Sequence, residues 1–297
     1  MKTTIRPISV VIPTYNREDR LPSAIRSVLE QTAPPAEIIV VDDGSTDGTP
    51  ALVRTFPGVR YLCQENQGVS AARNHGISAA KHDWIALLDS DDEWLPRKLE
   101  RQWSALKGDP RYRFCHTDEI WIRKGRRVNP MKKHAKYGGH IFHHCLPLCV
   151  ISPSSALIHR DLFERFGVFD PELPVCEDYD LWLRICAREP VLYVDEPLLL
   201  KYGGHEDQLS RAYWGMDRFR IRALEKLIQS GALEGEALTA ALDTLYGKID
   251  IYAAGAEKRR RFEEADRYLD KKRRIAVSLV SLASLASLAC YAGTAGS

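Results

Sequence analysis

The chain lacks a strong net charge, a secretory signal peptide and a regular cysteine spacing, the features that would assign it to a protein class directly. Its formal net charge is only +2 over 297 residues, which excludes the broad basic surface on which most nucleic-acid-binding proteins rely. Its N-terminus lacks the charged and apolar regions of a secretory signal peptide, and its seven cysteines are an odd number without a framework spacing. We therefore expect a cytoplasmic protein with reduced thiols and no nucleic acid among its partners.

Histidine and cysteine do gather in one place, at His140, His143, His144, Cys145 and Cys149. Their spacing matches no standard zinc site, and three apolar residues interrupt the cluster. We prefer the interpretation that these are buried thiols beside a loop over a zinc site.

The chain does contain a regular alternation of apolar runs and helical patterns. β-Branched apolar runs predict strands over residues 8–13, 37–43, 59–63 and 84–89. The segments between them predict helices near 21–29, 48–55 and 69–81. Because the strands are apolar throughout rather than alternately, they favour a parallel sheet covered on both faces.

Polar residues follow three of these strands, as "TYNR", "DDGSTDG" and "DSDDE". Ligands of parallel sheets bind at the carboxyl ends of the strands, so we expect the three loops to form one site. After Pro110 the pattern becomes mixed, with strands expected over 113–122, 154–160 and 191–202 and a helix from Asp178 to Arg188. Beyond about residue 206 the chain is predicted to be helical.

Four acidic side chains lie within five positions: Asp89, Asp91, Asp92 and Glu93. If the strand continues through them, Asp89 and Asp91 point the same way, because strand side chains alternate with period two. Such a D-x-D pair can bind Mg²⁺ or Mn²⁺, whose coordination shell phosphate oxygens complete. The alternative is that Asp92 and Glu93 cap a helix that begins near Pro96.

Six ordered segments carry a resemblance to a known family: "SVVIPTYNR", "IRSVLEQT", "EIIVVDDGSTDGT", "NQGVSAARNHGI", "IALLDSDDEWLPRKLE" and "GVFDPELPVCEDYDLWLRI". They resemble the family 2 glycosyltransferases. The resemblance implies an α/β protein of the GT-A (nucleotide-diphospho-sugar transferase) fold, with a Rossmann-like, mostly parallel sheet flanked by helices and a helical C-terminal extension. It also implies sugar transfer with inversion at the anomeric carbon.

The resemblance assigns roles to individual residues. The implied contacts to the nucleotide sugar are Pro13, Thr14, Tyr15 and Asp43 at the base, Arg73 near the diphosphate and Asp89 at the ribose. The implied cofactor is a divalent cation, Mn²⁺ or Mg²⁺, with Asp91 and His205 as its ligands.

Asp178 resembles the family's catalytic base, which takes a proton from the acceptor hydroxyl. Glu177 and Asp180 are close enough to share that role, although in a helix only these two lie on one face. Capping of the helix by Asp178 is the alternative.

The C-terminal tail has two interpretations. Residues 275–292 contain no charge and follow the basic run 271–274, which fits a membrane-associated helix beside anionic lipid. The stretch also contains four serines and a tyrosine, and its leucines have the spacing of a soluble packed helix.

We therefore expect a GT-A domain over residues 1–205, with a nucleotide-sugar half (1–110) and an acceptor half (111–205), and a helical extension over 206–297. The expected reaction moves one sugar from a UDP-linked donor to a saccharide or lipid-linked acceptor in surface polysaccharide or lipopolysaccharide synthesis. The expected location is the cytoplasm, at the inner face of the cell membrane if the tail attaches. The alternatives are a non-catalytic nucleotide-sugar-binding scaffold and a sugar nucleotidyltransferase.

Overall fold

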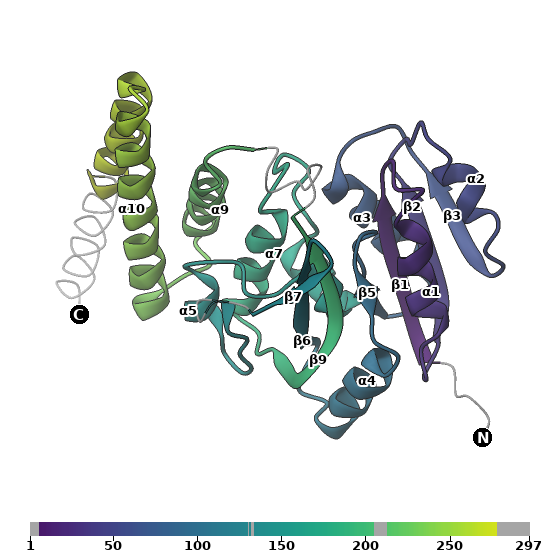
Figure 1. Cartoon of the computed structure of the whole chain (residues 1–297). Helices are drawn as coiled ribbons and strands as arrows, with labels where there is room; N and C mark the ends of the chain where they lie inside the picture. The colour runs from purple at the N-terminus through teal and green to yellow at the C-terminus, as the bar shows by residue number, and fades with distance from the viewer. Residues whose placement is uncertain (1–5, 130, 132–133, 205–212, 278–297) are drawn as a thin grey trace.

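A single sheet forms the framework of the molecule in a computed structural model that describes residues 6–129, 131, 134–204 and 213–277 (Figure 1). Nine strands belong to it within these residues, in the order β3-β2-β1-β4-β8-β6-β9-β5, with β7 paired to β6. The strands of the first half are β1 (Arg6–Thr14), β2 (Pro35–Asp42), β3 (Val59–Cys63), β4 (Trp84–Leu87) and β5 (Glu93–Trp94). Those of the second half are β6 (Phe114–Arg123), β7 (Arg126–Val128), β8 (Leu157–His159) and β9 (Leu192–Gly203).

The sheet is mostly parallel. β1 pairs in parallel with β2 on one side and with β4 on the other, and β2 pairs in parallel with β3. β8 is antiparallel to both β4 and β6, whereas β6 and β9 are parallel neighbours. The predicted fold class, a mostly parallel α/β sheet, is confirmed.

Helices cover both faces of the sheet. They are α1 (Leu21–Leu29), α2 (Thr49–Val53), α3 (Val69–Ala79), α4 (Lys98–Gly108), α5 (Phe142–Cys145), α6 (Arg160–Phe166), α7 (Glu177–Cys186), α9 (Asp217–Gln229) and α10 (Gly235–Lys258). Alternate residues of β1 serve the two faces: Ile8, Val10 and Ile12 pack in the cluster that contains α1, and Val11 packs in the one that contains α3.

The contact between α3 and β1 requires a glycine. A Cβ placed on Gly76 would lie 2.3 Å from Val11 Cγ1 and 3.1 Å from Val41 Cγ2. Such distances are far below van der Waals contact, so any larger residue would push α3 away from the sheet. This close packing fixes the helix that carries Arg73.

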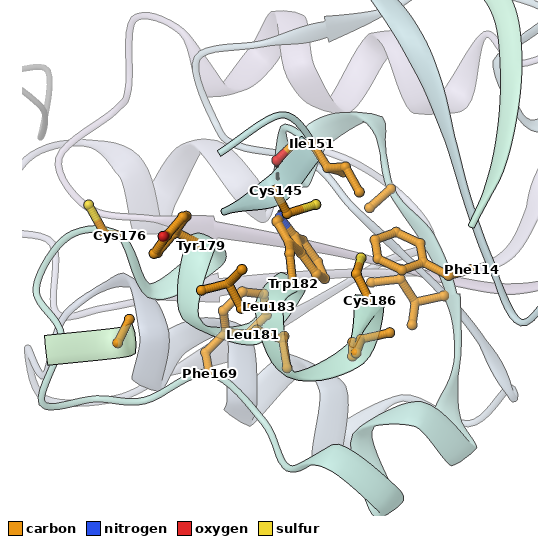
Figure 2. Close-up of a cluster of buried hydrophobic side chains, with 14 of the residues drawn as sticks. Phe114, Cys145, Ile151, Phe169, Cys176, Tyr179, Leu181, Trp182, Leu183 and Cys186 are labelled. Atoms are coloured by element: carbon orange, nitrogen blue, oxygen red, sulfur yellow. Dashed lines mark hydrogen bonds between the residues drawn. The ribbon is translucent and has the colours of Figure 1, made fainter. Parts of the chain in front are cut away.

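The core of the second half is built around α7, as Figure 2 shows. Trp182 and Tyr179 are almost completely buried, and the centroids of the Trp182 and Phe114 rings lie 4.8 Å apart. Trp182 Nε1 donates a hydrogen bond to the Ile151 carbonyl at 3.0 Å, and Tyr179 Oη donates to the Leu146 carbonyl at 2.6 Å. The N-terminus of α7 is therefore held in place from several sides.

The C-terminal helices extend this core. Ile221 and Leu224 of α9, with Leu245 and Ile249 of α10, belong to the same buried cluster as α7. Residues 262–277 form a further helix. None of the helices that the structure describes is long and apolar enough to cross a membrane, and residues 278–292 of the uncharged stretch lie outside the described part.

Two local predictions were wrong. The strand predicted over 84–89 ends at Leu87, so Asp89 and Asp91 lie in a turn and the alternation of strand side chains does not orient them. The helix expected near Pro96 begins at Lys98, and Glu93 lies in β5, so neither Asp92 nor Glu93 caps it.

Candidate active site

The acidic residues after β4 form a tight turn, in which the Asp92 N–H donates to the Asp89 carbonyl at 3.1 Å. Asp92 turns inward: its carboxylate accepts from Ser154 Oγ at 2.7 Å and from the Tyr202 N–H at 3.0 Å. Burial raises the pKa of Asp92 well above its usual value, and the charge of Asp91 adds to the shift. Asp92 thus anchors the turn, while Asp89 keeps 28% of its side chain exposed.

Arg73 connects this turn to α7. Its Nη2 lies 2.6 Å from Asp89 Oδ1 and its Nη1 lies 2.5 Å from Glu177 Oε1. Only 4% of the Arg73 side chain is exposed, and its guanidinium carbon lies 5.2 Å from the centre of the Phe169 ring. Burial alone would lower the pKa of Arg73, but the two carboxylates raise it above its ordinary value. The predicted diphosphate residue is therefore a permanent buried cation at the carboxyl edge of the sheet.

The three carboxylates of α7 lie in different surroundings. Burial raises the pKa of Glu177 to about 7, although Arg73 opposes the shift. Asp180 is only 2% exposed and forms ion pairs with Arg184 and Lys226, so it faces α9.

Asp178 is half-buried, and its carboxylate accepts a hydrogen bond from Cys149 Sγ at 3.2 Å. The N-cap is Cys176 and Asp178 lies inside the helix, so the capping alternative was wrong.

A second cation, the half-buried Lys201 of β9, lies among several carboxylates. Lys201 Nζ donates to Ser152 Oγ at 2.5 Å. Burial alone would lower its pKa, but Glu119, Asp92, Asp89 and Asp178 raise it above the ordinary value. Glu119 in turn lies 3.1 Å from Lys136 Nζ and accepts from Trp121 Nε1 at 2.7 Å. Burial alone would raise the pKa of Glu119, but the charges of Lys201 and Lys136 lower it to about 2.

Lys201 and Glu119 were not among the predicted site residues. Lys201 follows three leucines in β9, whereas Glu119 stands beside Asp118 in β6. A charge in an apolar run is costly unless it is paired, so Lys201 was a usable signal and Glu119 was not.

The residues predicted to contact the base lie at the carboxyl ends of β1 and β2. Pro13 and Thr14 end β1, beside Val41 and Asp42 of β2, and Tyr15 follows with 45% of its surface exposed. Asp43 is buried and holds the loop before α3: it accepts from Gln64 Nε2 and from the N–H groups of Gln67 and Gly68 at 2.8 to 2.9 Å. β1 lies between β2 and β4 in the sheet. The residues at the ends of β1 and β2 therefore lie at the same edge of the sheet as the acidic turn after β4, which Arg73 contacts.

Two clefts open at this edge. One, of about 400 Å³, is lined by Asp91, Asp92, Arg20, Lys124 and Tyr202 among others. The other, of about 270 Å³, is lined by Trp121, Glu119, Lys201, Cys149 and Arg220 among others. Ile122, Tyr202 and Gly203 line both. The first adjoins the acidic turn, and the second reaches Asp178 through Cys149.

Comparison with known proteins agrees with this geometry. The model of the glycosyl transferase family 2 matches residues 9–167. The chain belongs to this family. An uncharacterised glycosyltransferase of Rickettsia felis is 34% identical over 212 residues, which are 69% of this chain and 35% of the relative. The chain therefore spans about a third of the length of that relative.

A functionally named relative and two solved structures are also similar. The Escherichia coli UDP-Glc:alpha-D-GlcNAc-diphosphoundecaprenol beta-1,3-glucosyltransferase WfaP is 30% identical over 61% of this chain and 70% of its own. S. aureus TarS 1-349 in complex with UDP-GlcNAc has a TM-score of 0.69 at 18% identity, over 87% of this chain and 79% of that one. The mannosyltransferase PcManGT of Pyrobaculum calidifontis, in complex with GDP-Man and Mn²⁺, has a TM-score of 0.58 at 18% identity. The match covers 91% of this chain and 80% of that one.

The carboxylate oxygens of the acidic turn are of the kind that a hard divalent cation takes when it binds together with a diphosphate. Asp91 lines the larger cleft, and Asp89 is partly exposed beside it. No three His, Cys, Asp or Glu residues converge on a common point within the described residues, including the histidine and cysteine cluster at 140–149. A Mg²⁺ or Mn²⁺ ion needs only one or two carboxylates when phosphate oxygens and water fill its shell. His205, the other predicted ligand, lies outside the described residues.

Proposed function

We propose that the protein is an inverting glycosyltransferase that moves one sugar from a UDP-linked donor to a saccharide or lipid-linked acceptor. The single observation that carries the proposal is the bridge from Arg73 to both Asp89 and Glu177, since it brings the acidic turn and the start of α7 to one point. UDP as the carrier is supported by the Escherichia coli relative, named for UDP-Glc, and by the TarS complex with UDP-GlcNAc. The proposed setting is cell-surface polysaccharide or lipopolysaccharide synthesis.

The donor is proposed to bind at the carboxyl ends of β1, β2 and β4. Pro13, Thr14, Tyr15 and Asp43 take the base, Asp89 takes the ribose, and Arg73 stands near the diphosphate. Asp91 and His205 hold the divalent cation, which would neutralise the charge of the departing diphosphate. In this division residues 1–110 serve the donor and residues 111–205 the acceptor, and residues 206–297 form the helical extension.

Asp178 is proposed as the general base. Its carboxylate accepts the proton of the acceptor hydroxyl while that oxygen bonds to the anomeric carbon from the face opposite the nucleotide. The bond between the anomeric carbon and the diphosphate oxygen breaks, and its electron pair leaves with the nucleoside diphosphate. Arg73 and Lys201 are fixed cations whose positive charge stabilises this anion without rearrangement.

The first experiment is a thermal-shift screen against nucleotide diphosphate sugars, each with and without Mn²⁺. A ligand that binds only the folded state raises the melting temperature, so a Mn²⁺-dependent rise with a UDP-sugar is expected. A melting temperature that no sugar nucleotide changes would contradict the donor site.

Turnover then separates the possible activities. Asp178→Asn should keep the thermal shift and lose about 10²- to 10⁴-fold in rate, whereas Asp91→Ala should lose the Mn²⁺-dependent part of the shift. An inactive parent that still binds the donor would indicate a scaffold. Release of pyrophosphate in place of a nucleoside diphosphate would indicate a nucleotidyltransferase.

A further inference from the structure

Basic and aromatic side chains gather at the turn that ends α10. Residues 258–261 read Lys-Arg-Arg-Arg, and Phe262 follows with 61% of its surface exposed. Trp214, from the segment before α9, is 38% exposed and stacks on Tyr252 with ring centroids 5.9 Å apart. We call Trp214, Arg218 and residues 258–262 the basic turn patch.

Arginines surround the indole. The guanidinium carbons of Arg218, Arg259 and Arg261 lie 5.2, 5.2 and 4.0 Å from the centre of the Trp214 ring. These contacts bring three positive charges to one partly exposed aromatic surface. The patch is therefore both cationic and amphipathic.

The positive charge of the patch is not cancelled locally. Residues 257–263 contain four cations and only two carboxylates, Glu257 and Glu263, for a net charge of +2, and Arg218 adds one more. Arg261 lies 3.7 Å from Glu264, which also accepts from Tyr252 Oη at 2.8 Å. Within the described part of the chain, Lys258, Arg259 and Arg260 form no ion pair.

The backbone of the turn would suit a different residue. Arg260 has φ +59, the left-handed conformation that favours glycine after a helix. The Arg260 N–H donates to the Glu257 carbonyl at 2.8 Å, and the Arg261 N–H donates to the Ala256 carbonyl at 3.0 Å. The geometry of the turn therefore does not by itself account for an arginine at this position.

We propose that the basic turn patch docks on an anionic lipid surface. Its cations contact the headgroups, and Phe262 and Trp214 enter the interface between headgroups and acyl chains, where aromatic rings are favoured. In Figure 1, α10 ends at the top of the view, the side toward which β1 also runs, so the docked protein presents the carboxyl edge of the sheet to the membrane. This inference concerns a surface other than the uncharged tail and does not depend on the proposed function.

Vesicle flotation with the full-length protein tests the proposal. Phosphatidylcholine vesicles with phosphatidylglycerol should bind the protein, vesicles without it should not, and added salt should weaken binding. Arg260→Gly should weaken it about fivefold, and Phe262→Ser about tenfold. Glycine suits the backbone of residue 260, so the first variant removes a charge without disturbing the turn. Arg54→Gln, which removes an exposed charge from the region after α2, is the matched control and should bind as the parent does.

Three results would overturn the proposal. One is equal binding to both kinds of vesicle. Another is unchanged binding by Arg260→Gly and Phe262→Ser, which would place any membrane contact elsewhere in the chain. The third is retention on immobilised heparin together with no vesicle binding, which would identify a soluble polyanion as the partner.

Discussion

Arg73 and Glu177 are 104 positions apart in the chain, yet their side chains meet at 2.5 Å in a buried ion pair. The pair joins α3 to α7, which carries Asp178. Neighbouring contacts support it: Asn74 Nδ2 donates to the Phe169 carbonyl at 2.8 Å, and the Phe169 N–H donates back to Asn74 Oδ1 at 3.0 Å. The relative position of the two halves of the proposed site is therefore set by a small number of buried polar bonds.

Replacing Arg73 tests this linkage. Arg73→Met leaves Glu177 and Asp89 without their buried cation, so the free energy of unfolding should fall by about 3–5 kcal/mol, with loss of sugar transfer. Urea unfolding and turnover measure the two effects. Arg111→Gln is the control, because it breaks an exposed ion pair with Asp109 and should change neither quantity measurably. An Arg73→Met protein as stable as the parent would show that the pair is not what holds α3 to α7.

Glu119 should make stability depend on acid pH. Its pKa is about 2 in the folded protein against 4.5 for the ordinary carboxyl, so the folded state favours the ionised form. The stabilisation is complete above pH 4.5 and is lost as the pH falls toward 2. Glu119→Gln should therefore destabilise the protein by about 3–5 kcal/mol at pH 7.

The difference between the two proteins should shrink steadily as the pH is lowered from 4.5 toward 2. Urea unfolding over a pH series measures it. A difference that is constant over that range would mean that Glu119 does not owe its stabilising effect to its charge.

Cys149 should orient the proposed base. Burial first, and then the charge of Asp178, raises the pKa of this thiol well above its usual value, so it stays protonated and can donate to Asp178 Oδ2. This hydrogen bond orients the Asp178 carboxylate. Cys149→Ala should therefore lower kcat for sugar transfer, whereas Cys149→Ser, which keeps a donor, should not. Equal kcat values for all three proteins would exclude a role for the thiol in positioning the base.

Gly76 should tolerate no side chain. Gly76→Ala places a methyl group 2.3 Å from Val11 Cγ1, and the overpacking should cost about 1–3 kcal/mol of stability. Gly247→Ala, in the middle of α10, meets no atom within 4 Å and should stabilise the helix by up to about 1 kcal/mol. Thermal or urea unfolding of the two variants compares the same chemical change in opposite settings. A loss of stability in both would point to the backbone rather than to packing.

Most elements of the first half could be predicted from the sequence, because β1, β2 and β4 are buried apolar runs and α1 presents one apolar face. The end of β4 could not. Its length depends on pairing with β8, through the pairs Trp84–His159 and Ala86–Leu157. The sequence around β4 contains no signal that identifies β8 as its partner. The turn at Asp89–Asp92 follows from this early end.

The candidate site was predictable in part for a similar reason. Arg73, Asp89 and Asp178 stand in recognisable motifs, and the structure brings the first two into contact. Lys201 and Glu119 belong to β9 and β6, which are parallel neighbours far apart in sequence. Glu119 forms its ion pair with Lys136, and the charge of Lys201 acts on it from the neighbouring strand. These contacts are tertiary, so the local sequence pattern could not reveal them.

Tyr202 lines both clefts of the candidate site. It lines the cleft beside the acidic turn on one side and the cleft beside Glu119 and Cys149 on the other. Asp19 or Trp121 can be exchanged to reshape one cleft while leaving the other alone, because each lines only one of them. A change at Tyr202 alters both at once, so the shapes of the two clefts cannot be changed independently at this position.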